Sequence, residues 1–143
     1  MTLDQKVLSY ELSKKLDEKG IVLDTEFYWA EFYNKSSNVP DEQLSQLVHD
    51  HEKEEFEERP YLKDVVFYPA PLLVEMLEVI ERLIKAGKIQ QIDITLREER
   101  KEIYVFYGEY EREAEGETII EKTAQTILHL LENGHITLED INK

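Results

Sequence analysis

The chain contains no cysteine among its 143 residues, and glycine is scarce as well. Without cysteine there are no disulfide bonds, no thiolate metal sites and no cysteine nucleophiles. The five glycines are too widely spaced to form a phosphate-binding loop, and Gly20, Gly87 and Gly134 stand where helices are expected to end. Thiol chemistry and the common nucleotide-binding loops are therefore excluded.

A hydrophobic run long enough to cross a membrane is also missing. The most apolar stretch, residues 67–84, is interrupted by two prolines and four charged residues. The first residues, Met1–Lys6, show no basic region followed by an apolar core, so no signal peptide is expected. We therefore expect a cytoplasmic protein that makes no contact with a membrane.

Positive charge is in short supply. Lysine and arginine together number 17 against 32 aspartates and glutamates, which gives a net charge of −15. Such a surface repels phosphate backbones, so direct binding of nucleic acid is not expected. The acidic residues are concentrated in residues 41–60 and 98–117, with eight in each window. This acidity either keeps the protein soluble or imitates a polyanion, and the sequence leaves both interpretations open.

The helices follow from hydrophobic periodicity and capping residues. A helix is expected over residues 2–19, starting from a capping box of Thr2 and Gln5, and another over residues 72–86 behind Pro71. The last main helix is expected after Thr118, and a further turn after Thr137. A short helix is also expected after Pro40, where Leu44, Leu47 and Val48 would form one apolar face.

The strands are fewer. Residues 21–33 and 65–68 are predicted to be extended, and residues 92–96 and 103–110 to form a hairpin, followed by a loop at 111–117. The whole chain, 1–143, is predicted to be a single α+β domain, with a small, mainly antiparallel sheet and packed amphipathic helices. Residues 34–63 are interpreted as a mobile acidic insertion, and their most charged part, 49–59, as either a solvated helix or a loop.

The search for chemistry yields one candidate metal site, which we reject at this stage. His49 and His51 lie beside several carboxylates, and two imidazoles with a carboxylate can hold zinc or iron. On a helix, however, residues two apart point about 200° away from each other. No catalytic constellation, metal site or cofactor site is therefore assigned, and the sequence favours a protein that is not an enzyme.

The aromatic residues give a candidate interaction surface. Strand alternation places Phe27, Trp29 and Glu31 on one face and Tyr28, Ala30 and Phe32 on the other, and one of these faces is expected to feed the core. The other could present aromatic anchors to a partner. We therefore assign a candidate interaction surface with these members: Tyr28, Trp29, Tyr33, Glu54, Glu55, Glu57 and Glu58.

The strand at 103–110 has apolar residues on both faces, which requires cover from helices or from a second subunit. A homodimer is therefore one expected assembly.

Three segments carry a resemblance to known proteins. They are the helix end at Gly20 with the aromatic strand FYW, the segment YPAP that opens a helix at Pro71, and the hairpin followed by AEGET and the helix end LLENGHI. In this order they resemble a loose group of small uncharacterised proteins from phages, prophages and conjugative elements of bacteria. The resemblance covers most of the chain except residues 34–63. It implies a mobile-element origin and carries no catalytic residue.

Three functions remain open. The first is a non-enzymatic accessory protein of a phage or mobile element that binds another protein. The second is an acidic nucleic-acid mimic that inhibits a host defence or transcription enzyme, and it requires carboxylates gathered on one surface. The third is a small ligand-binding protein or enzyme, and it requires a concave pocket with converging polar groups.

Overall fold

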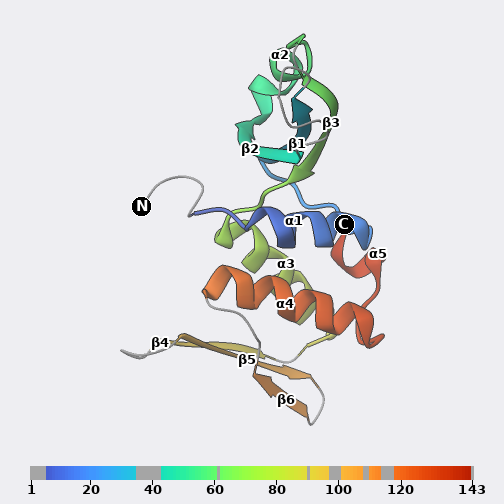
Figure 1. The fold of residues 1–143 in the computed structure, drawn as a ribbon. Coiled ribbons are helices and arrows are strands. Elements are labelled where there is room, and N and C mark those ends of the chain that lie inside the picture. The colour runs from blue at the N-terminus through green and yellow to red at the C-terminus, as the bar shows by residue number, and fades with distance from the viewer. Residues whose placement is uncertain are drawn as a thin grey trace.

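A three-stranded antiparallel sheet forms one end of the molecule. The computed structural model describes residues 6–34, 43–60, 62–89, 91–96, 101–107, 110–113 and 118–142, and the side chains among these except at 34, 43 and 91–113. The sheet, here called the upper sheet, consists of β1 (Phe27–Asn34), β2 (Gln43–His49) and β3 (Leu62–Pro69). The strand order is β2-β1-β3, so β1 is central (Figure 1).

A short helical connection covers one face of the upper sheet. A 3₁₀ turn, η2 (Asp50–Glu52), follows β2 directly and leads into α2 (Lys53–Glu57). Phe56 of α2 is 2% exposed and packs with Phe32, Val48 and Leu62 in a core that belongs to this end of the molecule. We call this cluster the upper core.

Four helices form the middle of the molecule, and a second sheet lies beyond them (Figure 1). The helices are α1 (Tyr10–Glu18), α3 (Leu73–Lys85), α4 (Ile119–Glu132) and α5 (Leu138–Ile141). The second sheet pairs β4 (Gln91–Leu96), β5 (Lys101–Tyr107) and β6 (Tyr110–Glu113) in that order, all antiparallel.

The helices bury a larger core of their own. Met76 and Leu83 of α3 and Ile127 and Leu130 of α4 are fully buried in it, and Ile141 of α5 closes it. Capping residues set the helix starts: the Glu75 carboxylate accepts the Leu72 N–H at 2.8 Å, and the Thr118 hydroxyl accepts the Glu121 N–H at 3.2 Å. The described side chains thus form two separate hydrophobic cores, one beneath the upper sheet and one among the helices.

These elements confirm the α+β fold with antiparallel sheets, and they confirm the helices behind Pro71, Thr118 and Thr137 and the hairpin. Three elements differ from expectation. The expected helix over 2–19 begins at Tyr10, because Val7 pairs with Leu72 in a β-bridge and the Ser9 hydroxyl accepts the Leu12 N–H. Thr2 and Gln5 lie outside the described residues.

The expected helix after Pro40 is wrong, because its described part is strand β2. Leu44, Leu47 and Val48 fit a helical face over so short a run, but the aromatic strand β1 offers a pairing edge along its whole length. In the strand, Leu44 and Val48 share the face that packs on the upper core. The structure also adds β6 within the expected loop at 111–117.

The described part of the predicted mobile insertion, 34–63, includes β2 and α2. Between residues 50 and 57 the charged run is helical, which agrees with one of the two interpretations of it. Its mobility stays a prediction.

Candidate functional site

A group of polar contacts between α1 and the upper sheet centres on Glu31. This carboxylate projects from the face of β1 opposite to the upper core and is only 12% exposed. It accepts a hydrogen bond from the Tyr10 hydroxyl, and the Lys14 Nζ lies 3.0 Å from its Oε2. Tyr10 and Lys14 are four residues apart on α1, so both reach the strand from one helix face.

Aromatic rings surround this carboxylate. Tyr10 makes edge-to-face contacts with Trp29 and Tyr68, with 6.3 Å between ring centroids in each pair. The Trp29 indole N–H donates to the Leu8 carbonyl at 2.8 Å. Trp29 and Tyr68 are cross-strand partners on β1 and β3, so the cluster ties α1 to two strands of the upper sheet. We call Tyr10, Lys14, Trp29, Glu31 and Tyr68 the joint.

The electrostatics of the joint follow from these contacts. Burial alone would raise the pKa of Glu31, but hydrogen bonds from Tyr10, Lys14 and Tyr68 and the positive charge of Lys14 outweigh it and hold the pKa below its usual value. Burial and the hydrogen bond to Glu31 raise the pKa of Tyr10 to about 12. Burial and the charge of Glu31 also raise the pKa of Tyr68.

Perturbed pKa values often mark active sites, but ion-pair networks that only stabilise a structure also perturb them. The joint is of this second kind. Every shift stabilises the charge state that the group already has at neutral pH. The donors of Tyr10, Lys14 and Tyr68 all converge on the Glu31 carboxylate, which is nearly buried. The joint therefore connects the upper sheet to the helices.

The joint was not predicted from the sequence. The available signal was a lone carboxylate at Glu31 between Trp29 and Tyr33 in an aromatic strand, together with the i, i+4 pair of Tyr10 and Lys14.

The predicted interaction surface divides between two faces of the upper sheet. Tyr28 packs against the upper core with Lys53 Nζ 3.9 Å from its ring centroid, and Trp29 belongs to the joint. Tyr33 is half-buried on the opposite face, next to its cross-strand partner Lys63. The faces alternate as predicted from the sequence, and neither Tyr28 nor Trp29 is an exposed anchor.

The four predicted glutamates lie elsewhere, on and after α2. Glu54, Glu55, Glu57 and Glu58 are all exposed, as are Asp50 and Glu52 just before them. Because Phe56 attaches α2 to the upper-core face, these carboxylates lie on the opposite side of the sheet from Tyr33. The structure therefore does not bring Tyr33 and the glutamates together. We call the six carboxylates between Asp50 and Glu58 the acidic segment.

The basic residues next to the acidic segment face inward. Lys53 lies over the rings of Tyr28 and Phe67, and the Arg59 guanidinium carbon lies 4.7 Å from the ring centroid of Phe56. In the described part of the chain, no lysine or arginine is within ion-pair distance of the carboxylates at 54, 55, 57 or 58. The negative charge of this segment is therefore left to solvent or to a partner.

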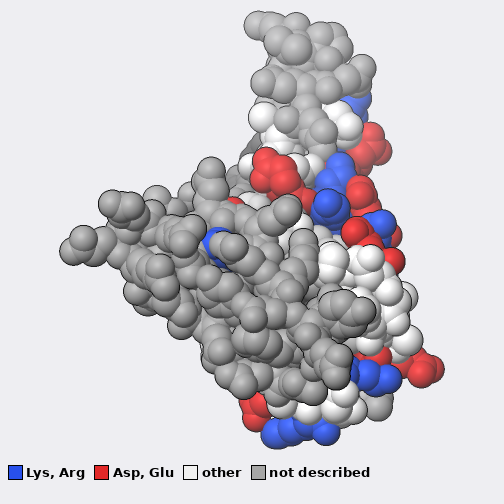
Figure 2. Space-filling view, turned by 90° about the horizontal axis from the view of Figure 1, so that it is seen from below, with Lys and Arg blue, Asp and Glu red and all other residues white. Residues whose placement is uncertain are grey.

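Elsewhere the charges are mixed. In a view from below, acidic and basic side chains of the described residues lie next to one another along the side of the molecule (Figure 2). The pairs Lys19–Glu132 and Lys85–Glu81 are examples of such neighbours. The acidic segment differs from these regions in having its cations turned inward.

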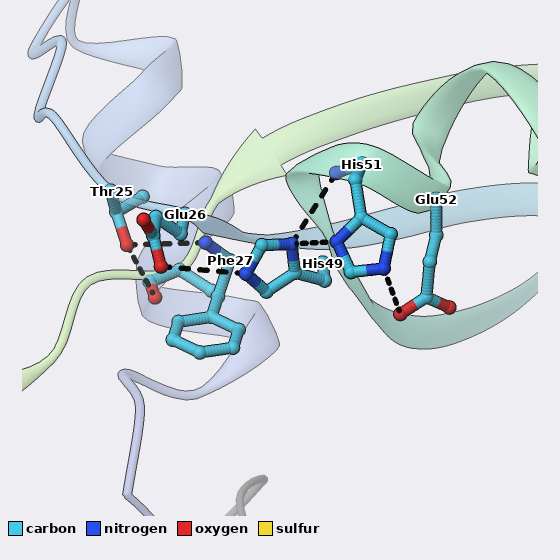
Figure 3. Close-up of polar contacts among 7 residues, drawn as sticks. Thr25, Glu26, Phe27, His49, His51 and Glu52 are labelled. Atoms are coloured by element: carbon cyan, nitrogen blue, oxygen red, sulfur yellow. Dashed lines mark hydrogen bonds and ion pairs between the residues drawn. The ribbon is translucent and has the colours of Figure 1, made fainter.

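The side chains of His49 and His51 lie close together. The expectation that they point away from each other on a helix is therefore wrong. His49 ends β2 and His51 lies in η2, and their Nδ1 atoms are 2.6 Å apart (Figure 3). His49 Nε2 lies 3.4 Å from Glu26, and His51 Nε2 lies 4.0 Å from Glu52. Each ring thus faces the other ring on one side and a carboxylate on the other.

This arrangement offers a metal ion two nitrogen donors, and the described residues add no third ligand. Among the residues that the structure describes, no group of three or more histidine, aspartate or glutamate side chains is arranged to hold a metal ion.

One groove bears on the ligand-binding hypothesis. It has a volume of about 530 Å³ and lies between α3, the end of α5 and residues 22–24. Its charged groups include Glu75, which caps α3, and Glu81 with Lys85, which pair at 2.9 Å. These three groups interact with the protein itself, and the groove is also lined by Asp24, Glu78 and Arg82.

Comparisons with known proteins add no identity. No protein-family model, no curated protein and no solved structure matches the chain. Within the described ranges, no helix has both the length and the apolar character needed to cross a bilayer.

Proposed function

We propose that this chain is a non-enzymatic, protein-binding accessory protein of a phage or mobile element, and that its acidic segment contacts a basic surface on the partner. The observation that carries this proposal is the orientation of charge around α2. The carboxylates point to solvent, while Lys53 and Arg59 lie over aromatic rings of the upper core.

The way α2 is held supports a binding role. Phe56 fixes this helix of five residues against the upper core through edge-to-face contacts with Phe32 and Phe67, at 5.2 Å and 6.3 Å between centroids. The backbone that carries the carboxylates is therefore attached to the sheet. A partner loses less free energy in ordering an attached segment than in ordering a free loop.

The joint also supports a binding role, because it holds the upper sheet in place on the helices. It contains a partly buried ion pair, Lys14–Glu31, which joins α1 to β1, and the ring contact of Tyr10 with Tyr68 joins α1 to β3. The upper sheet, with its own core, is thereby fixed as a unit on the helices.

The nucleic-acid mimic is a second candidate, and the same charge orientation favours it. Mimicry needs carboxylates gathered on one surface, and residues 50–58 carry six exposed carboxylates whose neighbouring cations, Lys53 and Arg59, lie over aromatic rings. The other acidic window, 98–117, lies outside the residues whose side chains are described. The two candidates differ in the partner: a mimic competes with DNA or RNA for it, and a general protein binder does not.

Affinity capture tests the proposal. The full chain is compared with a variant in which Glu54, Glu55, Glu57 and Glu58 become glutamine. The control changes four other exposed carboxylates to amides, at Glu11, Asp17, Glu18 and Glu78, so both variants gain four charge units. We expect specific bacterial proteins that bind the wild type and the control and are lost from the first variant. Equal capture by all three chains, or no specific capture, would refute the proposal.

A further inference from the structure

The outer edge of β2 has backbone groups available for pairing. Asp50 N–H donates to the Glu26 carbonyl at 2.7 Å, in the same register that pairs Phe27 with His49. Hydrogen-bonded pairs alternate in an antiparallel ladder, so Val48, Gln46 and Leu44 also bond to β1. The N–H and C=O groups of Ser45 and Leu47 therefore point away from β1. Among the described residues no strand pairs with this edge.

The backbone hydrogen bonds between β1 and β3 support this alternation. Ala70 N–H donates to the Phe27 carbonyl at 2.8 Å, so odd-numbered residues of β1 bond to β3 and even-numbered ones bond to β2.

The two edges of the upper sheet differ in protection. On β3, Asp64 adopts a φ of 53° where the register shifts, Lys63 adds a charge beside it, and Pro69 removes an outward N–H. Bulges, charges and proline are the devices that keep an edge strand from pairing with another chain. The sequence of β2, QLSQLVH, has none of them, and its register with β1 is regular.

We propose that the outer edge of β2 pairs with β2 of a second copy of this chain, antiparallel across a two-fold axis at Gln46, to form one continuous six-stranded sheet. This register sets Gln46 against Gln46 of the second copy, where two amides can hydrogen-bond. It sets Ser45 against Leu47, whose outward backbone groups then bond to each other.

The same register extends the upper core. Leu44 of one copy comes opposite Val48 of the other, on the face that α2 covers. Val48 is buried and Leu44 is half-buried against the upper core, so the two cores meet along the new strand pair.

Charge favours this strand as the contact between two copies. At a net charge of −15, most surfaces of two copies repel each other, but β2 has no acidic or basic residue other than His49. The acidic segment begins at the end of β2, so the two-fold axis places its first residue, Asp50, and the equivalent residue of the second copy at opposite ends of the strand pair. Eight residue steps of about 3.3 Å separate Asp50 from its equivalent, roughly 26 Å, which exceeds the screening length of about 8 Å at physiological salt. The acidic segments remain free, so this dimer is independent of the proposed partner binding.

Charge substitution at the axis tests the proposal. Gln46 is exposed, so Gln46→Glu and Gln46→Lys both leave the monomer fold intact while placing two like charges face to face in the dimer. By sedimentation equilibrium of the full chain, we expect the wild type at twice the mass of one chain. Each variant should dissociate at least tenfold more readily, although one substitution raises the net negative charge and the other lowers it.

An equimolar mixture of the two variants should recover the dimer, because glutamate then faces lysine. A matched backbone pair adds a second readout: Ser45→Pro removes an outward N–H and should weaken the dimer, and Ser45→Ala should not. A wild type that sediments as a monomer overturns the proposal. Single variants at Gln46 that remain fully dimeric, or a mixture that stays monomeric, also overturn it.

Discussion

The Lys14 ammonium lies 3.0 Å from the Glu31 carboxylate, so an ion pair joins the first helix to the central strand of the upper sheet. The Tyr10 hydroxyl donates to the same carboxylate. These contacts make one side chain, Glu31, responsible for much of the attachment between the sheet and the helices.

Substitution of Glu31 by glutamine should loosen this attachment. The variant keeps the side-chain size but loses the charge that Lys14 and Tyr10 recognise, and charge-assisted hydrogen bonds contribute about 1–3 kcal/mol. We expect the free energy of unfolding to fall by roughly that amount, as measured by urea denaturation. Trp29, the single tryptophan, reports on the joint through its fluorescence. A variant as stable as the wild type would show that Glu31 is not needed there.

The joint also predicts how stability depends on pH. The pKa of Glu31 is lowered in the folded state, so its contribution is present above the unfolded pKa of about 4.5 and is lost as the pH falls through the folded pKa. The pKa of Tyr10 is raised to about 12, so its contribution is present below 10.0 and is lost as the pH rises towards 12. Urea unfolding as a function of pH should show both losses, and Glu31→Gln should reduce them. Unchanged curves in the variant would contradict this assignment.

Gly20 and Gly87 form a matched pair for backbone strain. Both have positive φ, at 84° and 73°, so alanine at either position should cost about 1–2 kcal/mol. A Cβ at Gly20 would lie 3.2 Å from Leu138 Cδ1, whereas a Cβ at Gly87 would meet nothing within 4 Å. We expect Gly20→Ala to be the more destabilising in thermal denaturation. Adding Leu138→Ala should bring it close to Gly87→Ala, and a persistent difference would place the cost elsewhere.

Phe56 should control α2 and the upper core. It is 2% exposed and contacts Phe32 and Phe67, so Phe56→Ala should cost about 3–5 kcal/mol. Because the helices have a core of their own, hydrogen exchange should accelerate more in β1, β2 and β3 than in α3 and α4. Equal acceleration in both regions would show that the two cores unfold as one unit.

The sequence predicted the elements that local rules decide. Proline, threonine and glycine marked α3 and α4, and strand alternation separated Ala30 and Phe32 from Trp29 and Glu31. It failed at β2, because Leu44, Leu47 and Val48 suit both a helical turn and a strand, and only pairing with β1 decides between them. The predicted start of the first helix was wrong for the same reason, since the bridge between Val7 and Leu72 is a tertiary contact.

The candidate site was predictable in part. The exposed glutamates of the acidic segment follow from composition, but their orientation depends on where Lys53 and Arg59 lie, and the aromatic partners of these cations come from distant strands. The approach of His49 to His51 required the change from strand to 3₁₀ turn between them. The joint required α1, β1 and β3 to be assembled first.

The most direct test of the proposed function is the dissociation constant for a captured partner, measured for the wild type and for the two variants that each neutralise four carboxylates. Exposed charge pairs contribute about 0.2–1 kcal/mol each, so loss of four should weaken binding by about fourfold or more. We predict this loss when Glu54, Glu55, Glu57 and Glu58 become glutamine, and a change of less than about twofold for the control at Glu11, Asp17, Glu18 and Glu78. Equal affinities for the two variants would contradict a role for the acidic segment.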